Sequence, residues 1–357
     1  MNWPRFGRSR RRFISFLLIG IGLAITATAC NPAGQTSESG QGGRSSSVTL
    51  TLVSYAVTRA AYTNIIPLFT QHWKEQTGQD VVFEQSYGGS GSQTRAIIDG
   101  LDADVVALAI PSDIIQIEEA GLIEPGWENE TPNGNGIVHR SVSVIVTRDG
   151  NPKNIQDWAD LTRDNVTFVI ANPLTSGGAR WNYLALWGFI TANGGTEEQA
   201  RKFVTEAYAN VPVLSRDARE ASDAFFIQNQ GDALINYENE AILAGQQGQT
   251  VSYVIPSSNI SIDNPIAVLD AYVDQRGTRE VAEAFVAFLF TPEAQREFAK
   301  AGFRSVNDEV TQEFAAEYPE IKNLFTAGDL GGWTEIGSKF FADGALFEQI
   351  QAEIARR

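Results

Sequence analysis

Apolar and polar positions in this chain follow two spacings, one typical of buried strands and the other of amphipathic helices. Residues 48–55 alternate and are rich in β-branched side chains, which predicts a strand. Beyond them, apolar residues three and four positions apart continue to Trp73, which predicts a helix that ends at Gly78. Pro67 lies inside this pattern, so we expect the helix to kink or restart there.

The same succession of strand and helix recurs along the rest of the chain. Strands are predicted at 80–85, 104–110, 141–147, 166–171, 211–214, 231–240, 251–255 and 265–269. Helices are predicted at 112–120, 197–208 and 222–228, and over most of the chain from 279 onward. This alternation is typical of the α/β class, and the roughly 310 residues from position 48 onward are too many for one compact core. We therefore expect two α/β lobes, with 141–147 and 265–269 crossing between them.

One stretch, 172–189, has the form of an anion-binding helix start. A predicted strand precedes it, Asn172-Pro173 turns the chain, and Ser176, Gly177 and Gly178 begin the helix. The first N–H groups of a helix have no partner within it and lie at the positive end of its dipole, so they can bind an anion. Glycine lets a ligand approach the backbone closely. Taken alone, this stretch is also compatible with an ordinary helix start that Ser176 caps.

Three further turns of this kind follow residues 55, 87 and 216, and the strand at 231–240 brings Tyr237 to the same level. In open α/β sheets, ligands bind at the carboxyl ends of the strands, where helix N-termini gather. Convergence of the turns would give a site made only of donors. These donors are the backbone N–H groups of Ser90, Gly177, Gly178 and Ala218, the Ser176 hydroxyl and the Tyr237 ring hydroxyl.

A donor-only site selects among tetrahedral anions by their protonation. Fully ionised sulfate has only acceptors and suits such a site, whereas phosphate near neutral pH keeps a proton and needs an acceptor. Arg59, Arg180 and Arg219 each follow one of the turns closely. Because backbone donors already occupy the turns, we expect these arginines to pair with acids or to lie behind the site, and direct contact with the anion is the alternative.

The N-terminus has the pattern of a secretory signal at 1–29, with an arginine-rich start and an apolar stretch at 13–25. The sequence S-R-R-R-F-I also fits twin-arginine export. Ala27-Thr28-Ala29 suits ordinary signal peptidase, while small residues directly before Cys30, the one cysteine of the chain, resemble a lipid attachment site. Residues 30–47 are rich in Gly, Ser and Gln and predict a flexible tether. We therefore expect a periplasmic protein with Cys30 as its candidate lipid anchor.

The charge balance excludes several partners. The full chain has 27 basic and 43 acidic side chains, and removal of 1–29 takes away five arginines, which leaves 22 basic residues and a net charge of −21. A body this acidic is a poor partner for nucleic acid or for an acidic membrane surface. It repels an anionic ligand at long range, but screening over about 10 Å lets local donors decide binding.

Catalytic and metal chemistry have few residues to support them. His72 lies in the first predicted helix and His139 in a predicted polar loop, and neither is near Cys30 in sequence. This spacing does not suit a metal, and we expect neither a metal nor a cofactor. A secreted hydrolase with Ser176 as nucleophile is the alternative from another functional class, but the turn lacks the G-x-S-x-G elbow. We therefore expect a binding protein and not an enzyme.

At these residues the chain resembles the periplasmic sulfate-binding proteins of ABC-type sulfate and thiosulfate importers. The resemblance covers nearly the whole body and is carried by V-S-Y-x-x-T-R, H-W-K-x-x-T-G, Q-S-Y-G-G-S-G, S-G-G-A-R-W-N-Y-L-A, E-N-E-A and G-G-W. It implies a type II binding-protein fold, in which two lobes joined by two crossing segments hold a dehydrated anion without a countercharge. It also implies that Ser90, Gly177, Gly178 and Ala218 donate backbone N–H groups and Ser176 its hydroxyl.

Two positions differ from the family pattern. Ala56 stands where the family has an acidic residue that donates its backbone N–H, and alanine keeps that N–H. Tyr237 stands where the family has a tryptophan that donates its indole N–H, and tyrosine has a differently shaped donor. Both residues are therefore included in the expected site, and Tyr237 affects the relative affinity for sulfate and thiosulfate.

The resemblance implies the substrate-capturing component of a sulfate importer, which closes on sulfate and docks on a membrane permease. Thiosulfate or another tetrahedral oxyanion is the alternative ligand. The expected domains are 1–29 (signal peptide), 30–47 (tether), 48–140 with 262–357 (lobe 1) and 141–261 (lobe 2). The expected state is a monomer.

Overall fold

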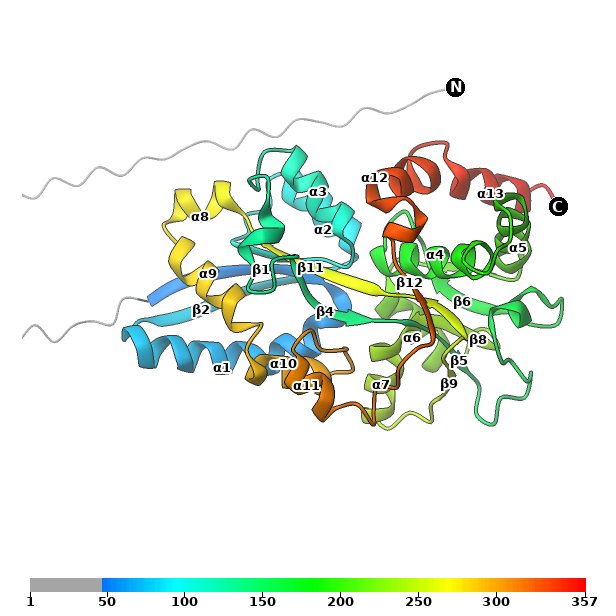
Figure 1. Ribbon diagram of the computed structural model, residues 1–357, viewed down its shortest axis with the longest axis horizontal. Helices are drawn as coiled ribbons and strands as arrows, with labels where there is room; N and C mark the ends of the chain where they lie inside the picture. The colour runs from blue at the N-terminus through cyan, green and yellow to red at the C-terminus, as the bar shows by residue number, and fades with distance from the viewer. Residues whose placement is uncertain (1–46) are drawn as a thin grey trace, which may run out of the picture. The chain divides into compact units, whose positions relative to one another are not determined.

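The computed structural model describes residues 47–357, which form two five-stranded sheets with helices on both faces (Figure 1). The first sheet, with its helices, is lobe 1. It contains β1 (Ser47–Tyr55), β2 (Asp80–Gly88), β3 (Val105–Ala107), β4 (Ile137–Ser141) and β11 (Ile262–Val268), in the order β2-β1-β3-β11-β4. β1 runs parallel to β2 and β3, and β11 runs antiparallel to β3 and β4. This register places the ends of β1 and β2, Tyr55 and Gly88, side by side.

The second sheet, with its helices, is lobe 2 and repeats the plan of the first. It contains β5 (Ser143–Thr147), β6 (Phe168–Ala171), β7 (Leu214–Ser215), β8 (Ala233–Tyr237) and β9 (Ser252–Val254), in the order β7-β6-β8-β5-β9. β6 is parallel to β7 and β8, and β5 is antiparallel to β8 and β9. The chain passes from lobe 1 to lobe 2 between β4 and β5 and returns into β11. The predicted α/β fold with two lobes and two crossing segments is confirmed.

Helices cover both faces of each sheet, as expected where parallel strands are joined by helical crossovers. In lobe 1, α2 (Ser90–Ile98) and α3 (Pro111–Glu119) lie on one face, and α1 (Arg59–Thr77) and α10 (Pro292–Lys300) on the other (Figure 1). In lobe 2, α4 (Gly177–Thr191) and α5 (Glu197–Ala209) lie opposite α6 (Ala218–Phe226) and α7 (Glu238–Gln246). Lobe 1 also contains α8 (Asp270–Arg276), α9 (Arg279–Phe288) and α11 (Asp308–Glu313).

The C-terminal segment packs on lobe 2. β12 (Asn323–Phe325) pairs in parallel with β10 (Ser258–Ile260), and α13 (Leu346–Ile354) packs against α5. Between them, α12 (Gly332–Ile336) places the Trp333 ring edge-on against Trp181 of α4, with ring centroids 4.7 Å apart. The sequence assigned all of 262–357 to lobe 1, whereas from β12 onward this segment contacts lobe 2.

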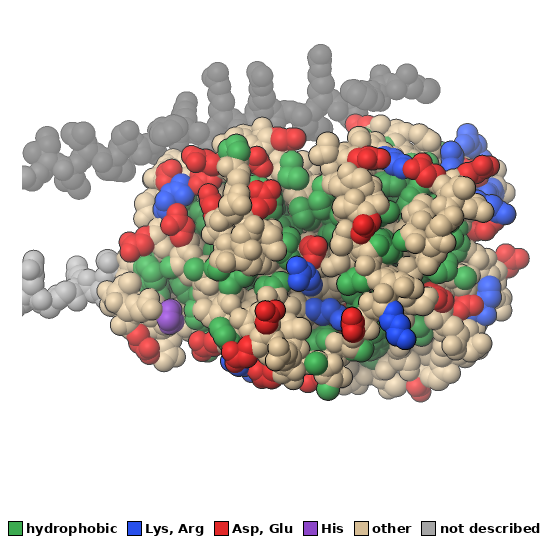
Figure 2. Space-filling view, in the orientation of Figure 1, with side chains coloured by type: hydrophobic (Ala, Val, Ile, Leu, Met, Phe, Trp, Pro, Cys, Tyr) green, Lys and Arg blue, Asp and Glu red, His purple; other side chains and the backbone are tan. Residues whose placement is uncertain are grey.

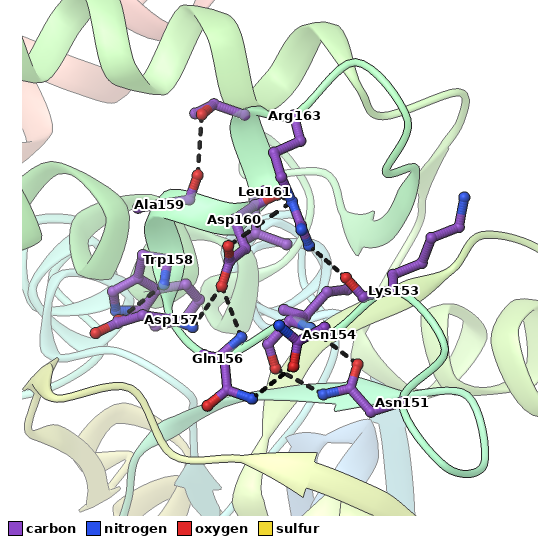
Figure 3. A network of polar contacts seen from close by, with 12 residues as sticks. Asn151, Lys153, Asn154, Gln156, Asp157, Trp158, Ala159, Asp160, Leu161 and Arg163 are labelled. Atoms are coloured by element: carbon purple, nitrogen blue, oxygen red, sulfur yellow. Dashed lines mark hydrogen bonds and ion pairs between the residues drawn. The ribbon is translucent and has the colours of Figure 1, made fainter.

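Side-chain hydrogen bonds fix the irregular loop after β5 (Figure 3). Asp157 caps a 3-10 helix, Trp158–Thr162, by accepting the Trp158 N–H at 2.8 Å, while the Asp160 carboxylate accepts the Asp157 N–H at 3.1 Å. Asn151 bonds both the N–H and the C=O of Ile155, at 2.9 and 2.8 Å. The buried Trp158 indole then donates to the Ser258 carbonyl at 3.0 Å, which anchors the loop on β10.

Three local predictions differ from the structure. His139 lies in β4 with no solvent exposure, and not in a polar loop, because the Phe298 and Phe303 rings cover it. α1 runs through Pro67 without ending, since Pro67 is on the exposed face, where water can satisfy the carbonyl that proline leaves unpaired. The strand predicted to reach position 240 ends at Tyr237, where α7 begins.

Candidate anion-binding site

All seven residues that the sequence proposed as a site line one small cavity, to which both lobes contribute. They are Ala56, Ser90, Ser176, Gly177, Gly178, Ala218 and Tyr237. The free volume of this cavity, about 10 Å³, is close to the space that a single water molecule needs. A larger cavity of about 760 Å³ adjoins it and shares Ala56, Gly88, Gly89 and Asp217. The structure thus brings the residues together, while their role in binding stays a prediction.

Three helices begin at this cavity: α2 at Ser90, α4 at Gly177 and α6 at Ala218. A short 3-10 helix, Ala56–Thr58, begins there as well, directly after β1. The opening N–H groups of each helix have no carbonyl partner within the helix, and the dipoles of the helices add positive potential at the same point. The cavity therefore collects backbone donors from both lobes.

Ser176 is the N-cap of α4 and is 4% exposed. Its hydroxyl oxygen accepts the Ala179 N–H at 3.3 Å, and its own N–H donates to the Asn172 carbonyl at 2.9 Å. A hydroxyl also carries one proton to donate, and this proton has no acceptor among the described residues. Ser176 is therefore both the helix cap that the sequence allowed and a hydroxyl donor toward the cavity.

Gly177 and Gly178 have a steric role that the sequence argument missed. A Cβ added to Gly177 would lie 2.7 Å from the Ala109 Cβ of lobe 1, and one added to Gly178 would lie 2.5 Å from the Tyr237 ring. Both distances are shorter than any normal carbon contact. The glycines thus allow α4 to approach lobe 1 and Tyr237, in addition to leaving the backbone open.

Ser90 begins α2 with its hydroxyl already occupied. The hydroxyl donates to Asp113 Oδ2 at 2.5 Å and accepts the Ala109 N–H at 3.0 Å. Asp113 is 1% exposed, and its other oxygen lies 3.5 Å from the Arg180 guanidinium of lobe 2. Burial raises the pKa of Asp113, while Arg180 and Ser90 lower it. Ser90 is left with its backbone N–H as the donor for a ligand.

Asp217 brings a carboxylate to the edge of the cavity, where the sequence argument placed none. It caps α6 by accepting the Glu220 N–H at 2.9 Å, and its second oxygen accepts from the Arg216 guanidinium at 3.3 Å. Each oxygen thus accepts one hydrogen bond. The N–H of Ala218, the first residue of α6, remains available at the cavity.

Two tyrosines meet behind the cavity. Tyr237 ends β8 and Tyr55 ends β1, with ring centroids 6.1 Å apart, and both line the cavity. Both hydroxyls are buried and have no hydrogen-bond partner within the described residues. Burial raises the pKa of each phenol well above its usual value, so both keep their protons. Tyr55 was not among the residues expected from the sequence, although its position at the end of the first strand, directly before a proposed turn, could have indicated it.

Ala109 joins the lobes at the cavity wall. Its carbonyl accepts the Trp181 indole N–H of lobe 2 at 2.6 Å and the Asn264 side-chain N–H of β11 at 2.9 Å. Close by, a Cβ on Gly89 would lie 2.6 Å from the Thr175 carbonyl oxygen. The lobes are therefore in direct contact around the cavity.

The arginines that follow the turns are engaged by other groups. Arg180 pairs with Asp113, and Arg219 approaches Glu240 at 2.7 Å, which confirms the expected pairing with acids for these two. Glu240 also accepts the Ser222 hydroxyl at 2.7 Å, and its burial raises its pKa to about 7. Arg59 lies over the Tyr87 ring at 4.4 Å. On the face in Figure 2, Asp and Glu side chains are spread over both lobes, with fewer Lys and Arg between them.

Neither histidine lines the cavity. His72 is on α1 and lies 3.0 Å from the Gln76 side chain, while burial lowers the pKa of His139 to about 3, so its ring stays neutral. The described residues contain no cluster of His, Cys, Asp or Glu side chains suited to a metal ion. In the same residues no helix is long and apolar enough to cross a membrane. Cys30, the signal at 1–29 and nearly all of the tether lie outside the described residues.

Comparison with known proteins gives a consistent set of relatives. The model of the family described as bacterial extracellular solute-binding protein matches residues 50–304. A sulfate-binding protein of Synechococcus elongatus is 56% identical over 350 residues, 98% of this chain and 99% of its own length. A thiosulfate-binding protein of Pseudomonas aeruginosa is 37% identical over 303 residues, 84% of this chain and 90% of its own. The solved structure of the sulfate-binding protein SubI from Mycobacterium tuberculosis has a TM-score of 0.76 and 36% identity, covering 82% of this chain and 99% of its own.

Proposed function

The chain belongs to the sulfate-binding proteins within the bacterial extracellular solute-binding family, and from this premise we propose that it captures dehydrated sulfate in the cavity between its lobes. It is a component of solute transport and not an enzyme. The donors would be the backbone N–H groups of Ala56, Ser90, Gly177, Gly178 and Ala218, the Ser176 hydroxyl and the Tyr237 hydroxyl.

One observation carries the proposal: neutral donors from both lobes surround a cavity that no Lys or Arg lines within the described chain. Hydrogen bonds to a charged acceptor contribute about 1.5–3 kcal/mol each, so several together can offset dehydration of a dianion. Arg180 and Arg219 lie nearby, but they pair with Asp113 and Glu240 and do not line the cavity. A sulfate here would be held by dipoles and not by a countercharge.

Thiosulfate is the alternative ligand, because relatives named for it share the fold and much of the sequence. It replaces one sulfate oxygen by a larger sulfur, which accepts hydrogen bonds weakly. The N–H and O–H donors around the cavity favour sulfate, all four of whose oxygens accept hydrogen bonds well. The hydrolase alternative has no support, since neither histidine lines the cavity with Ser176.

The second part of the proposed role is delivery of the bound anion to a membrane permease. Ligand binding would hold the two lobes closed, as hinge closure does in other periplasmic binding proteins, and the closed form would dock on the permease of an ABC importer. We place the protein in the periplasm as a monomer, with the signal at 1–29 removed and the tether at 30–47 leading from a Cys30 lipid anchor to the body. Mass measurement of the mature N-terminus tests the anchor.

The binding proposal is tested by calorimetric titration of sulfate into the mature protein and into Ser176→Ala. Loss of the hydroxyl donor should weaken sulfate binding by about 1–3 kcal/mol, because the amide donors remain. Thr291→Ala is the matched control: Thr291 caps α10 and accepts the Ala294 N–H at the same distance, 3.3 Å, but lies outside the cavity. The control should lose a helix cap and keep its sulfate affinity. Equal affinity of Ser176→Ala and wild type would place the site elsewhere.

A further inference from the structure

The larger cavity of about 760 Å³, which adjoins the candidate site, is charged differently on its two walls. Among the described residues that form its lobe 1 wall, only Arg59, the first residue of α1, carries a charge. The charged residues of its lobe 2 wall are Arg216, Asp217, Arg219, Glu220 and Asp223. An anion that enters through this cavity therefore passes a cation on one side and carboxylates on the other.

Arg59 differs from the two arginines of the lobe 2 wall because its charge is not compensated. Arg216 and Arg219 each lie beside a carboxylate, at 3.3 and 2.7 Å. Arg59 forms no ion pair within residues 47–357, and its guanidinium lies over the Tyr87 ring, 4.4 Å from the ring centre. The face of an aromatic ring attracts a guanidinium and does not neutralise it. Arg59 is exposed, so its positive charge acts on ions in the cavity.

This charge is placed where an anionic ligand needs it. The mature chain has a net charge of −21, which repels sulfate at long range. A single local charge can offset this repulsion near the entrance. In water, Coulomb attraction between a dianion and one positive charge about 10 Å away corresponds to an increase in association rate of about fourfold.

Resting on the proposed function, we propose that Arg59 guides sulfate into the cleft. It attracts the free anion to the lobe 1 wall before the lobes close, and it has no contact with the bound anion, because it does not line the small cavity. Arg59 is thus a positioning residue for association, whereas the donors of the small cavity retain the ligand. Asp223, whose side chain also forms no ion pair within the described chain, opposes Arg59 from the other wall.

The test is stopped-flow mixing of the mature protein with sodium sulfate, followed by tryptophan fluorescence. Trp181 serves as the reporter, since its indole donates across the lobes to the Ala109 carbonyl. At an ionic strength of about 10 mM, where the Debye length is about 30 Å, Arg59→Gln should lower kon about fourfold and leave koff unchanged. At about 1 M, where the Debye length is about 3 Å, this variant and wild type should associate at the same rate.

Three further variants separate charge from shape. Arg59→Lys keeps the positive charge and should keep the wild-type kon. Asp223→Asn removes the opposing charge and should raise kon at low ionic strength, which tests the same attraction without a change at Arg59. Lys322→Gln is the control, because it removes one positive charge from an exposed residue that lines neither cavity, and it should leave kon close to the wild-type value.

The outcomes distinguish this inference from the function on which it rests. Equal kon values of Arg59→Gln and Lys322→Gln at low ionic strength overturn the inference and leave the proposed function intact. An effect of Arg59→Gln on koff alone also overturns it, because Arg59 would then hold the bound anion. Association of Arg59→Lys as slow as that of Arg59→Gln excludes charge as the cause and overturns it too. Absence of sulfate binding by the wild type overturns the proposed function, and the inference with it.

Discussion

The two serines at the cavity, Ser90 in lobe 1 and Ser176 in lobe 2, make opposite use of their polar groups. In Ser90 the hydroxyl is occupied by Asp113 and the Ala109 N–H, and the backbone N–H is left for a ligand. In Ser176 the backbone N–H is occupied by the Asn172 carbonyl, and the hydroxyl proton is left. The same residue type thus presents a different atom to the cavity in each lobe.

Position in the helix and buried neighbours cause this difference. Ser176 precedes its helix as N-cap, where the side chain folds back on Ala179, whereas Ser90 is the first helical residue and has a carboxylate within reach. In lobe 1 the buried carboxylate beside the cavity, Asp113, accepts a hydrogen bond directly from the site residue Ser90. In lobe 2 the buried carboxylate, Glu240, accepts from Ser222 and pairs with Arg219, and has no hydrogen bond to Ala218 or Ser176.

A methyl group at Gly177 should reduce sulfate affinity more than any other change, because it would break the contact between the two lobes. Its Cβ would lie 2.7 Å from the Ala109 Cβ and 3.2 Å from the Ser90 Cβ, both in lobe 1. Gly177→Ala keeps the backbone N–H but blocks the close approach of α4, so we expect sulfate affinity to fall more than about 100-fold, or roughly 3 kcal/mol. Titration calorimetry measures the sulfate affinity of this variant.

Gly245→Ala is the matched control for this change. Gly245 is also a helical glycine, in α7, but the nearest atom to its added Cβ is 4.0 Å away. This variant should bind sulfate normally and be as stable as wild type or slightly more so, since alanine favours the helix. Wild-type affinity in Gly177→Ala would show that the lobes need not meet as described.

The buried carboxylate of lobe 2 should give the stability a pH dependence. Burial raises the pKa of Glu240 from 4.5 to about 7, and Arg219 and Ser222 only partly oppose this. Because the folded protein prefers the protonated acid, the stability from this group is present below about pH 4.5 and is lost as the pH rises to about 7. The loss corresponds to roughly 3 kcal/mol.

Glu240→Gln removes this titration and keeps the shape of the side chain. Urea unfolding at a series of pH values, without sulfate, should show the variant gaining stability relative to wild type between about pH 4.5 and 7. A difference between the two proteins that stays constant across this range would contradict the assignment.

Much of the fold could be predicted from the sequence because its strands are apolar runs bounded by strong turn residues. The strand before Ser176 and the helix after it follow directly from such a pattern. The strand β4 could not be predicted, because only Ile137 and Val138 in it are apolar and the burial of His139 depends on phenylalanines more than 150 residues later in sequence. The attachment of the C-terminal segment to lobe 2 depends likewise on tertiary contacts.

The candidate site was predictable as a set of positions and not as a set of interactions. Turn and helix-start patterns locate Ser90, Gly177 and Ala218, since backbone donors follow from secondary structure alone. The partners of each side chain come from other parts of the chain: Asp113 for Ser90, Ala109 for Trp181 and Asn264 for Ala109. Sequence patterns carry no information on such long-range pairings.

The most direct measurement compares Ser90→Ala with Ser176→Ala for both sulfate affinity and unfolding in sulfate-free buffer. Ser90→Ala removes a hydroxyl that supports Asp113 and the Ala109 N–H, so it should lower stability by about 1–3 kcal/mol and keep sulfate affinity within about threefold of wild type. Ser176→Ala should show the reverse, with a loss of affinity that exceeds its loss of stability. A large loss of affinity in Ser90→Ala with unchanged stability would contradict the assignment of amide to one serine and hydroxyl to the other.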